Sequence, residues 1–177
     1  VNTGGATLFE ELGKLMKSSG NKREVDLQIH SILEKIKFEV PSLIIADCSG
    51  SMTGLATFVA RLLATTAMLK NPSNKLDNLL FTFGSDCKIY TDGSTGTNQK
   101  NRFVQGVAQK VDKLVDRKKS FSENYESISR FIHSNDGSTE FSSVAKRLSQ
   151  WIESDQDLKA HRIEQLQGYP VFIVVSD

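Results

Sequence analysis

The chain has little of what a disulfide scaffold, a membrane span or a general nucleic-acid binder needs. Its 177 residues include two cysteines, Cys48 and Cys87, which are too few for a disulfide framework and favour a reducing, cytoplasmic setting. No apolar run approaches the roughly 18 residues of a membrane span, and no signal peptide is visible. The 22 basic and 21 acidic residues nearly cancel, which argues against a general polyanion binder.

What is present is the composition of a globular domain. Hydrophobic residues make up 38% of the chain and charged residues 24%. The length predicts about one domain, with a core of its own. We expect residues 1–40 to form a helical N-terminal extension, with a short helix near 8–16 and another over 22–37, and residues 41–177 to form the main domain.

The main domain alternates strand patterns with helix patterns. The predicted strands are short apolar segments, at 43–46, 79–83, 87–90 and 171–175. The predicted helices lie between them, at 54–70, 104–119, 123–133 and 141–152. This alternation predicts an α/β fold: a Rossmann-like, doubly wound, mainly parallel sheet with helices on both faces.

The last segment, 171–175, carries an expectation of its own. It is apolar at every position, a pattern typical of a strand covered on both faces and flanked by strands on both sides. Because no further strand follows it in the sequence, we expect the domain to be incomplete at its C-terminal end, with further strands and a helix missing. The alternative is an edge strand.

A polar loop follows the first predicted strand, where open α/β sheets bind ligands. Asp47, Ser49 and Ser51 alternate in it, and Gly50 allows the backbone to curl so that both hydroxyls face one point. One carboxylate and two hydroxyls suit a hard cation such as Mg²⁺, which takes about six oxygen ligands.

Two more oxygen-bearing side chains stand at equivalent places. Thr139 precedes the predicted helix at 141–152, and Asp177 ends the last predicted strand. The run Asp47-Cys48-Ser49-Gly50-Ser51-Met52 resembles the first motif of the metal-ion-dependent adhesion site (MIDAS) of the von Willebrand factor A (VWA) domain. Thr139 and Asp177 resemble the threonine and the second aspartate of that site, and the resemblance covers about residues 41–177.

The resemblance implies a metal site formed by Asp47, Ser49, Ser51, Thr139 and Asp177. It would bind Mg²⁺ or Mn²⁺, with the hydroxyls as direct ligands, the aspartates acting largely through water, and one position open for an Asp or Glu of a protein partner. Such a module is not an enzyme. The intact motif with free cysteines is most similar to the intracellular branch of the family, which includes partners of AAA+ ATPases and Ro-type RNA-binding proteins.

Other functions stay open at this point. The chain is alternatively the VWA part of a Ro-like protein, with RNA bound through a missing domain, or a structural subunit of a large assembly. Ser51 or Thr53 alternatively serves only to cap the following helix, and Asp47 is alternatively a phosphoryl-accepting nucleophile. The cysteines are expected to be buried structural residues, and the three histidines have no zinc-site spacing.

A basic cluster runs from Lys110 to Lys119. Two aspartates within it partly neutralise the charge, so we interpret it as a solvated face, with a face for phosphates or an acidic partner as the alternative.

Overall fold

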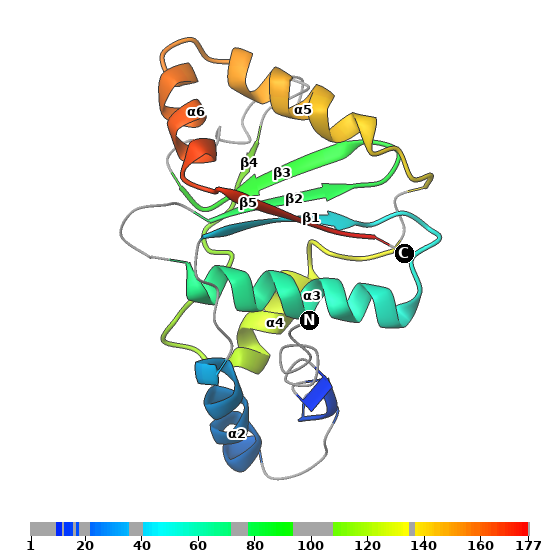
Figure 1. Ribbon diagram of the computed structural model, residues 1–177, viewed down its shortest axis with the longest axis vertical. Coiled ribbons are helices and arrows are strands. Elements are labelled where there is room, and N and C mark those ends of the chain that lie inside the picture. Colours follow the sequence, from blue (N-terminus) through cyan, green and yellow to red (C-terminus); the bar gives the residue numbers. More distant parts are fainter. Residues whose placement is uncertain are drawn as a thin grey trace.

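A five-stranded sheet lies between two layers of helices in the computed structural model (Figure 1). The structure describes residues 10–11, 13–15, 17, 22–35, 41–71, 78–93, 108–134 and 137–176. The strands are β1 (Ser42–Asp47), β2 (Leu79–Phe83), β3 (Cys87–Thr91), β4 (Gln109–Lys110) and β5 (Val171–Val175), in the spatial order β4-β3-β2-β1-β5. β1 is parallel to β2 and β5, whereas β3 is antiparallel to β2 and parallel to β4.

The helices cover both faces of this sheet. They are α2 (Lys22–Lys35), α3 (Gly54–Lys70), α4 (Phe121–Ser129), α5 (Ser142–Glu153) and α6 (Lys159–Gln167). α3 and α4 lie on one face and α5 and α6 on the other, with α2 packed beyond α3 and α4 (Figure 1). The predicted α/β class and mainly parallel sheet are therefore confirmed. Among the described residues no helix is long and apolar enough to cross a membrane.

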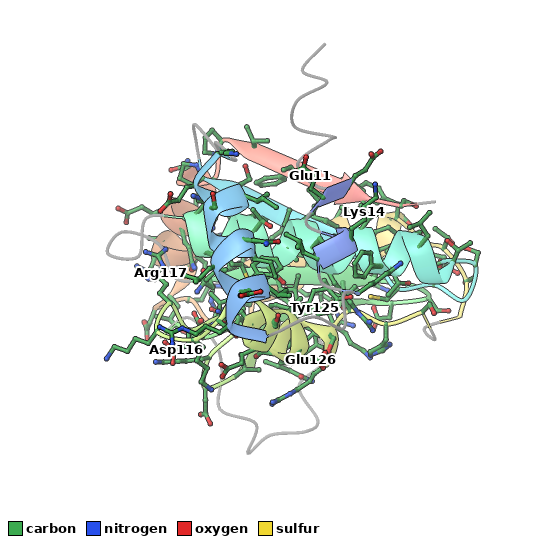
Figure 2. All side chains as sticks on the ribbon, turned by 90° about the horizontal axis from the view of Figure 1, so that it is seen from below. Glu11, Lys14, Asp116, Arg117, Tyr125 and Glu126 are labelled. Carbon is green, nitrogen blue, oxygen red and sulfur yellow. The ribbon has the colours of Figure 1, made fainter. Side chains whose placement is uncertain are left out.

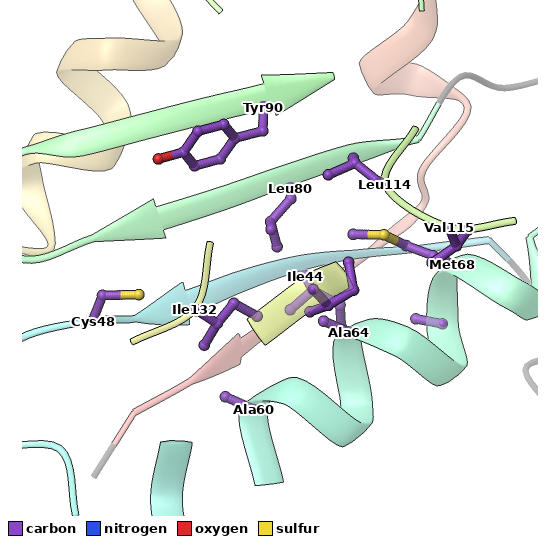
Figure 3. Close-up of a cluster of buried hydrophobic side chains, with 13 residues drawn as sticks. Ile44, Cys48, Ala60, Ala64, Met68, Leu80, Tyr90, Leu114, Val115 and Ile132 are labelled. Atoms are coloured by element: carbon purple, nitrogen blue, oxygen red, sulfur yellow. The ribbon is translucent and has the colours of Figure 1, made fainter. Parts of the chain in front are cut away.

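β1 is the centre of the core because both its faces are covered. Leu43 and Ile45 pack into the cluster under α5. Ile44 and Ala46 point the other way, into the cluster under α3, which Figure 3 shows. Each such large aliphatic side chain contributes about 1.5–3 kcal/mol when fully buried. The continuous apolar pattern of this segment follows from that double burial.

α3 begins and ends where its sequence directs. The Thr53 side chain accepts a hydrogen bond from the backbone N–H of Ala56 at 3.1 Å and so caps the helix. Alanines at positions 60, 64 and 67 form part of the buried cluster against β1, and their small size lets the helix lie close to the sheet. The helix ends at Lys70, two residues before a proline.

The helix predicted over 104–119 is wrong in its described part. Residues 109–110 form β4, and no helix follows until 121. The backbone N–H groups here have partners other than carbonyls one helical turn back: Val111 donates to the Thr91 carbonyl at 2.9 Å, and Leu114 donates to Asp92 Oδ2 at 3.2 Å. Valines at helical spacing misled the prediction, since β-branched residues suit this extended path better than a helix.

The other helices match their predictions within a few residues. α4 begins at Phe121, two residues earlier than expected, because the Ser120 hydroxyl accepts a hydrogen bond from the Glu123 N–H at 3.2 Å. α2 ends at Lys35 within the described residues. Its Ile29 and Ile32 pack with Tyr125 of α4, so the N-terminal extension contacts the main domain. The domain boundary at residue 40 stays a prediction.

β5 forms where the sequence predicts a strand. It pairs with β1 alone and lies at the edge of the sheet. Val171, Phe172 and Val174 are exposed. Within the described residues β5 is therefore an edge strand with exposed apolar side chains, and the expectation that further strands and a helix complete the domain stays a prediction.

Candidate metal centre

The loop after β1 is fixed by its own aspartate. Asp47 is the last residue of β1 and is only 1% exposed. Its Oδ1 accepts a hydrogen bond from the backbone N–H of Ser49 at 2.8 Å, which turns the chain back over the carboxylate. The Cys48 N–H donates to the Phe83 carbonyl at 2.7 Å and carries the parallel pairing one step past the strand. The loop thus lies at the carboxyl edge of the sheet.

A second loop, between α4 and α5, contacts the first loop and the turn between β2 and β3. The Gly50 N–H of the first loop donates to the Gly137 carbonyl at 2.8 Å, and the Glu140 N–H donates to the carbonyl of Gly84, in the turn, at 3.0 Å. Gly137 has a φ of 70°, and a Cβ built there would lie 2.3 Å from Ser85 Oγ. The position therefore favours glycine for two reasons, its left-handed backbone and its lack of space.

Together the two loops bring three hydroxyls to one point. Thr139 Oγ1 donates to Ser49 Oγ at 2.8 Å, and the Ser49 and Ser51 hydroxyls are 3.1 Å apart. Ser51 Oγ and Thr139 Oγ1 close the triangle at 3.5 Å. Ser49 is buried, whereas Ser51 and Thr139 are exposed, so the triangle faces solvent on one side.

The size of this triangle fits one face of a magnesium octahedron. Ligands about 2.1 Å from Mg²⁺ in octahedral geometry are about 3.0 Å apart when adjacent. The three oxygen–oxygen distances, 2.8, 3.1 and 3.5 Å, scatter around that value. The donors are also chemically suitable, because hydroxyl and carboxylate oxygens are hard ligands.

Sequence reasoning missed one residue of this arrangement, Ser176. It follows β5, and its hydroxyl donates to Asp47 Oδ2 at 2.7 Å, so both oxygens of the buried carboxylate accept a hydrogen bond. The signal available in the sequence was its position directly after an apolar strand pattern. Asp177, the fifth predicted site residue, lies outside the described residues, as does Asp136.

Ser51 does not cap α3. Thr53, not Ser51, caps α3, and the Ser51 hydroxyl instead meets Ser49 and Thr139. The Ser138 hydroxyl points elsewhere, to Ser85 Oγ at 3.3 Å and to Glu140 Oε1 at 3.3 Å.

The cysteines are buried and unbridged, as expected. Cys48 belongs to the cluster under α3, and Cys87 to the cluster under α5, on the opposite face of the sheet. Burial raises the pKa of the Cys87 thiol to about 12, so the thiol stays protonated at neutral pH. Both thiols therefore lie in hydrophobic clusters, and neither joins the three hydroxyls as a candidate metal ligand.

The described histidines and basic residues do not add to this site. Among the residues the structure describes, no three His, Cys, Asp or Glu side chains come together in a way that could hold a metal ion, and the candidate centre depends on hydroxyl oxygens instead. In the basic cluster, Lys113 Nζ lies 3.6 Å from Asp116 Oδ2, and Arg117 donates to the Asn71 carbonyl. Hydrogen bonding to the Lys118 N–H lowers the pKa of Asp116.

Comparison of the chain with protein-family models, with curated proteins and with solved structures finds no significant match.

Proposed function

We propose that this chain is a magnesium-dependent protein-interaction module of the VWA type. The observation that supports it best is the hydroxyl triangle of Ser49, Ser51 and Thr139. Thr139 is ninety residues from Ser49 in sequence, yet their oxygens are 2.8 Å apart. Hydrogen bonds hold the three hydroxyls at these separations, and the same separations suit the oxygen ligands of a hard cation.

Each residue has a role in the proposed centre. Ser49, Ser51 and Thr139 supply direct oxygen ligands. Asp47 supplies negative charge from its buried position at the end of β1, with its orientation fixed by the Ser49 N–H and by Ser176. Asp177 supplies a second carboxylate. Because the triangle faces solvent on one side, a position remains for an Asp or Glu of a protein partner, whose carboxylate completes the coordination of Mg²⁺ or Mn²⁺.

The sheet topology also supports the VWA-like, doubly wound interpretation. Ser49 and Ser51 follow β1, and Ser176, which donates to Asp47, follows β5; these two adjacent parallel strands have their carboxyl ends at the same edge of the sheet. Helices cover both faces of that sheet (Figure 1). This is where ligands bind in open α/β sheets.

The phosphoryl-transfer alternative is weaker. A nucleophilic aspartate must reach its substrate with a free oxygen, but Asp47 is almost fully buried and both of its oxygens accept hydrogen bonds. We therefore propose that Asp47 serves binding rather than phosphoryl transfer.

The test is binding of Mn²⁺, followed by the loss of the free-ion signal in electron paramagnetic resonance, with Mg²⁺ as competitor. Asp47→Ala should reduce Mn²⁺ affinity at least tenfold, because it removes the buried charge beneath the ligands. Ser51→Ala should also weaken binding. Ser138→Ala is the matched control, since this exposed serine lies in the same region but its hydroxyl is outside the triangle.

Unchanged Mn²⁺ affinity in Asp47→Ala, with circular dichroism showing the fold intact, would exclude the proposed centre. Equal losses in Ser51→Ala and Ser138→Ala would instead place the metal elsewhere in this region.

A further inference from the structure

An apolar groove runs along α3. It has a volume of about 480 Å³, and it lies between α3 and the described N-terminal helical residues 10, 13, 14 and 17. Figure 2 shows these helical residues alongside α3, seen from below. The α3 side of the groove is formed by Leu55, Phe58, Val59, Leu62 and Leu63.

These five side chains form one stripe of the helix. Their spacing of three and four residues places them on a single face of α3, and positions 55 to 63 span about 12 Å along the helix axis. The stripe is exposed at the end near the metal loop: Leu55 is 68% exposed. Exposed large aliphatic side chains that line a hollow typically mark a binding surface.

The opposite side of the groove is formed by Gly13 and by the side-chain stems of two lysines and one glutamate. Lys14 and Lys17 line it, with Lys17 Nζ 4.7 Å from the centre of the Phe58 ring. Among the described lining residues, Glu10 is the only acid. An occupant of this groove therefore needs an apolar face and, on the side of the lysines, negative charge.

The groove and the metal loop belong to neighbouring parts of the chain. Leu55, at the exposed end of the stripe, is the second residue of α3 and follows Ser51 by four positions. A segment bound along the stripe could therefore extend from Leu55 toward the loop of the hydroxyl triangle.

We propose that the groove holds a short amphipathic acidic helix of the same partner that supplies the metal-bridging carboxylate. Its apolar residues, at helical spacing, contact Leu55 and Val59, its acidic residues face Lys14 and Lys17, and an Asp or Glu at one end reaches the cation. A third helix packed into the hollow between two others is a common mode of peptide recognition. This inference rests on the proposed metal-dependent function.

The test uses the 177-residue chain and a displayed library of random peptides about 15 residues long, enough for four helical turns. Selection is carried out in Mg²⁺, and the peptide recovered most often is synthesised with a fluorophore for anisotropy titrations. The expected sequences combine large apolar residues three or four positions apart with Asp or Glu.

Two matched variants locate the bound peptide. Leu55→Asp should weaken its binding about tenfold or more, because a charge replaces an apolar contact. Leu27→Asp is the control: Leu27 is exposed to a similar extent, 62%, on α2, outside the groove. Both variants should keep the wild-type thermal unfolding midpoint.

The outcomes distinguish the groove from the metal. Binding that is lost in EDTA and in Asp47→Ala but is unchanged in Leu55→Asp would overturn the groove and leave the metal-dependent function standing. Binding that depends on Leu55 but survives EDTA and Asp47→Ala would support the groove as a binding site and overturn its link to the metal. Recovery of no binding peptide, or of peptides without acidic residues, would overturn the proposal.

Discussion

β1 and β5 are neighbours with similar sequences and opposite surroundings. Both are apolar at nearly every position, both run in the same direction, and they pair directly. Yet every residue of β1 is buried, whereas no residue of β5 is. Ile45 and Val174 are paired across this boundary, and they are 4% and 46% exposed.

The difference shows what a continuous apolar run does and does not specify. It predicts that the segment is a strand, since such runs of four to eight residues are typical of buried strands. Whether the strand is central or at an edge depends on which other strands pair with it. An apolar edge strand without charges also lacks the features that protect edges from unwanted pairing.

The largest expected effect comes from placing the same charge on both strands. Ile45→Lys should prevent folding, because an unpaired buried ammonium costs several kcal/mol in a protein whose total stability is about 5–15 kcal/mol. Val174→Lys, at the paired position, should change the free energy of unfolding by less than about 1 kcal/mol.

Chemical denaturation and size-exclusion chromatography check this pair of variants. Val174→Lys should also reduce self-association at high protein concentration, since edge lysines oppose strand pairing. If both lysine variants unfold the chain, β5 is covered in solution and the contrast between the two strands is wrong.

Most elements of the fold were predictable, because local patterns determined them. Thr53 and Ser120 mark the starts of α3 and α4 through hydrogen bonds to residues three positions ahead. The failure over 104–119 has a non-local cause. There Asp92, which precedes the segment by many residues, accepts the Leu114 N–H, and no local pattern announces such a partner.

The second prediction concerns Gly137, whose carbonyl holds the loop after β1 in place. Gly137→Ala should destabilise the chain by about 1–3 kcal/mol, because it forces a left-handed backbone on alanine and pushes against Ser85. Since the Gly137 carbonyl accepts the Gly50 N–H, Mn²⁺ affinity should fall as well.

Gly54→Ala is the matched control, because a Cβ at Gly54 meets no atom within 4 Å. It should leave Mn²⁺ affinity unchanged and stabilise α3 slightly. Equal thermal unfolding midpoints for the two alanine variants would contradict the left-handed backbone of Gly137 and its close approach to Ser85.

The candidate site was predictable in its members but not in its contacts. Asp47, Ser49 and Ser51 stand together in sequence, so their proximity needed only a loop. The place of Thr139 depends on two loops meeting, and the hydrogen bond from the Gly50 N–H to the Gly137 carbonyl holds those loops together. Ser176 was missed because a serine after an apolar strand is common, and only the β1–β5 pairing places it against Asp47.

The third prediction tests the hydrogen bond between the Ser176 and Asp47 side chains, which joins the ends of β1 and β5. Ser176→Ala should cost about 1–2 kcal/mol, since a buried carboxylate oxygen loses its donor. Ser154→Ala, which removes a serine hydroxyl far from the site, is a control for Mn²⁺ binding. A loss of Mn²⁺ affinity in Ser176→Ala alone would show that Ser176 positions Asp47, and equal affinities would mean that the end of β5 does not contribute.

The smallest expected effect is a pH dependence of stability that comes from β3, a mostly buried strand, in contrast to the exposed β5. Cys87 of β3 is buried, and this burial raises its thiol pKa from 9.0 to about 12. Between these two values the unfolded chain loses the proton and the folded chain keeps it, so the free energy of unfolding falls as the pH rises. The loss should reach about 1 kcal/mol by pH 10.

Urea denaturation from pH 8 to pH 10 measures this loss of stability, and Cys87→Ala should remove this part of the pH dependence. An unchanged pH dependence in Cys87→Ala would mean that water reaches β3 as it reaches β5, and that burial separates these strands less than the structure indicates.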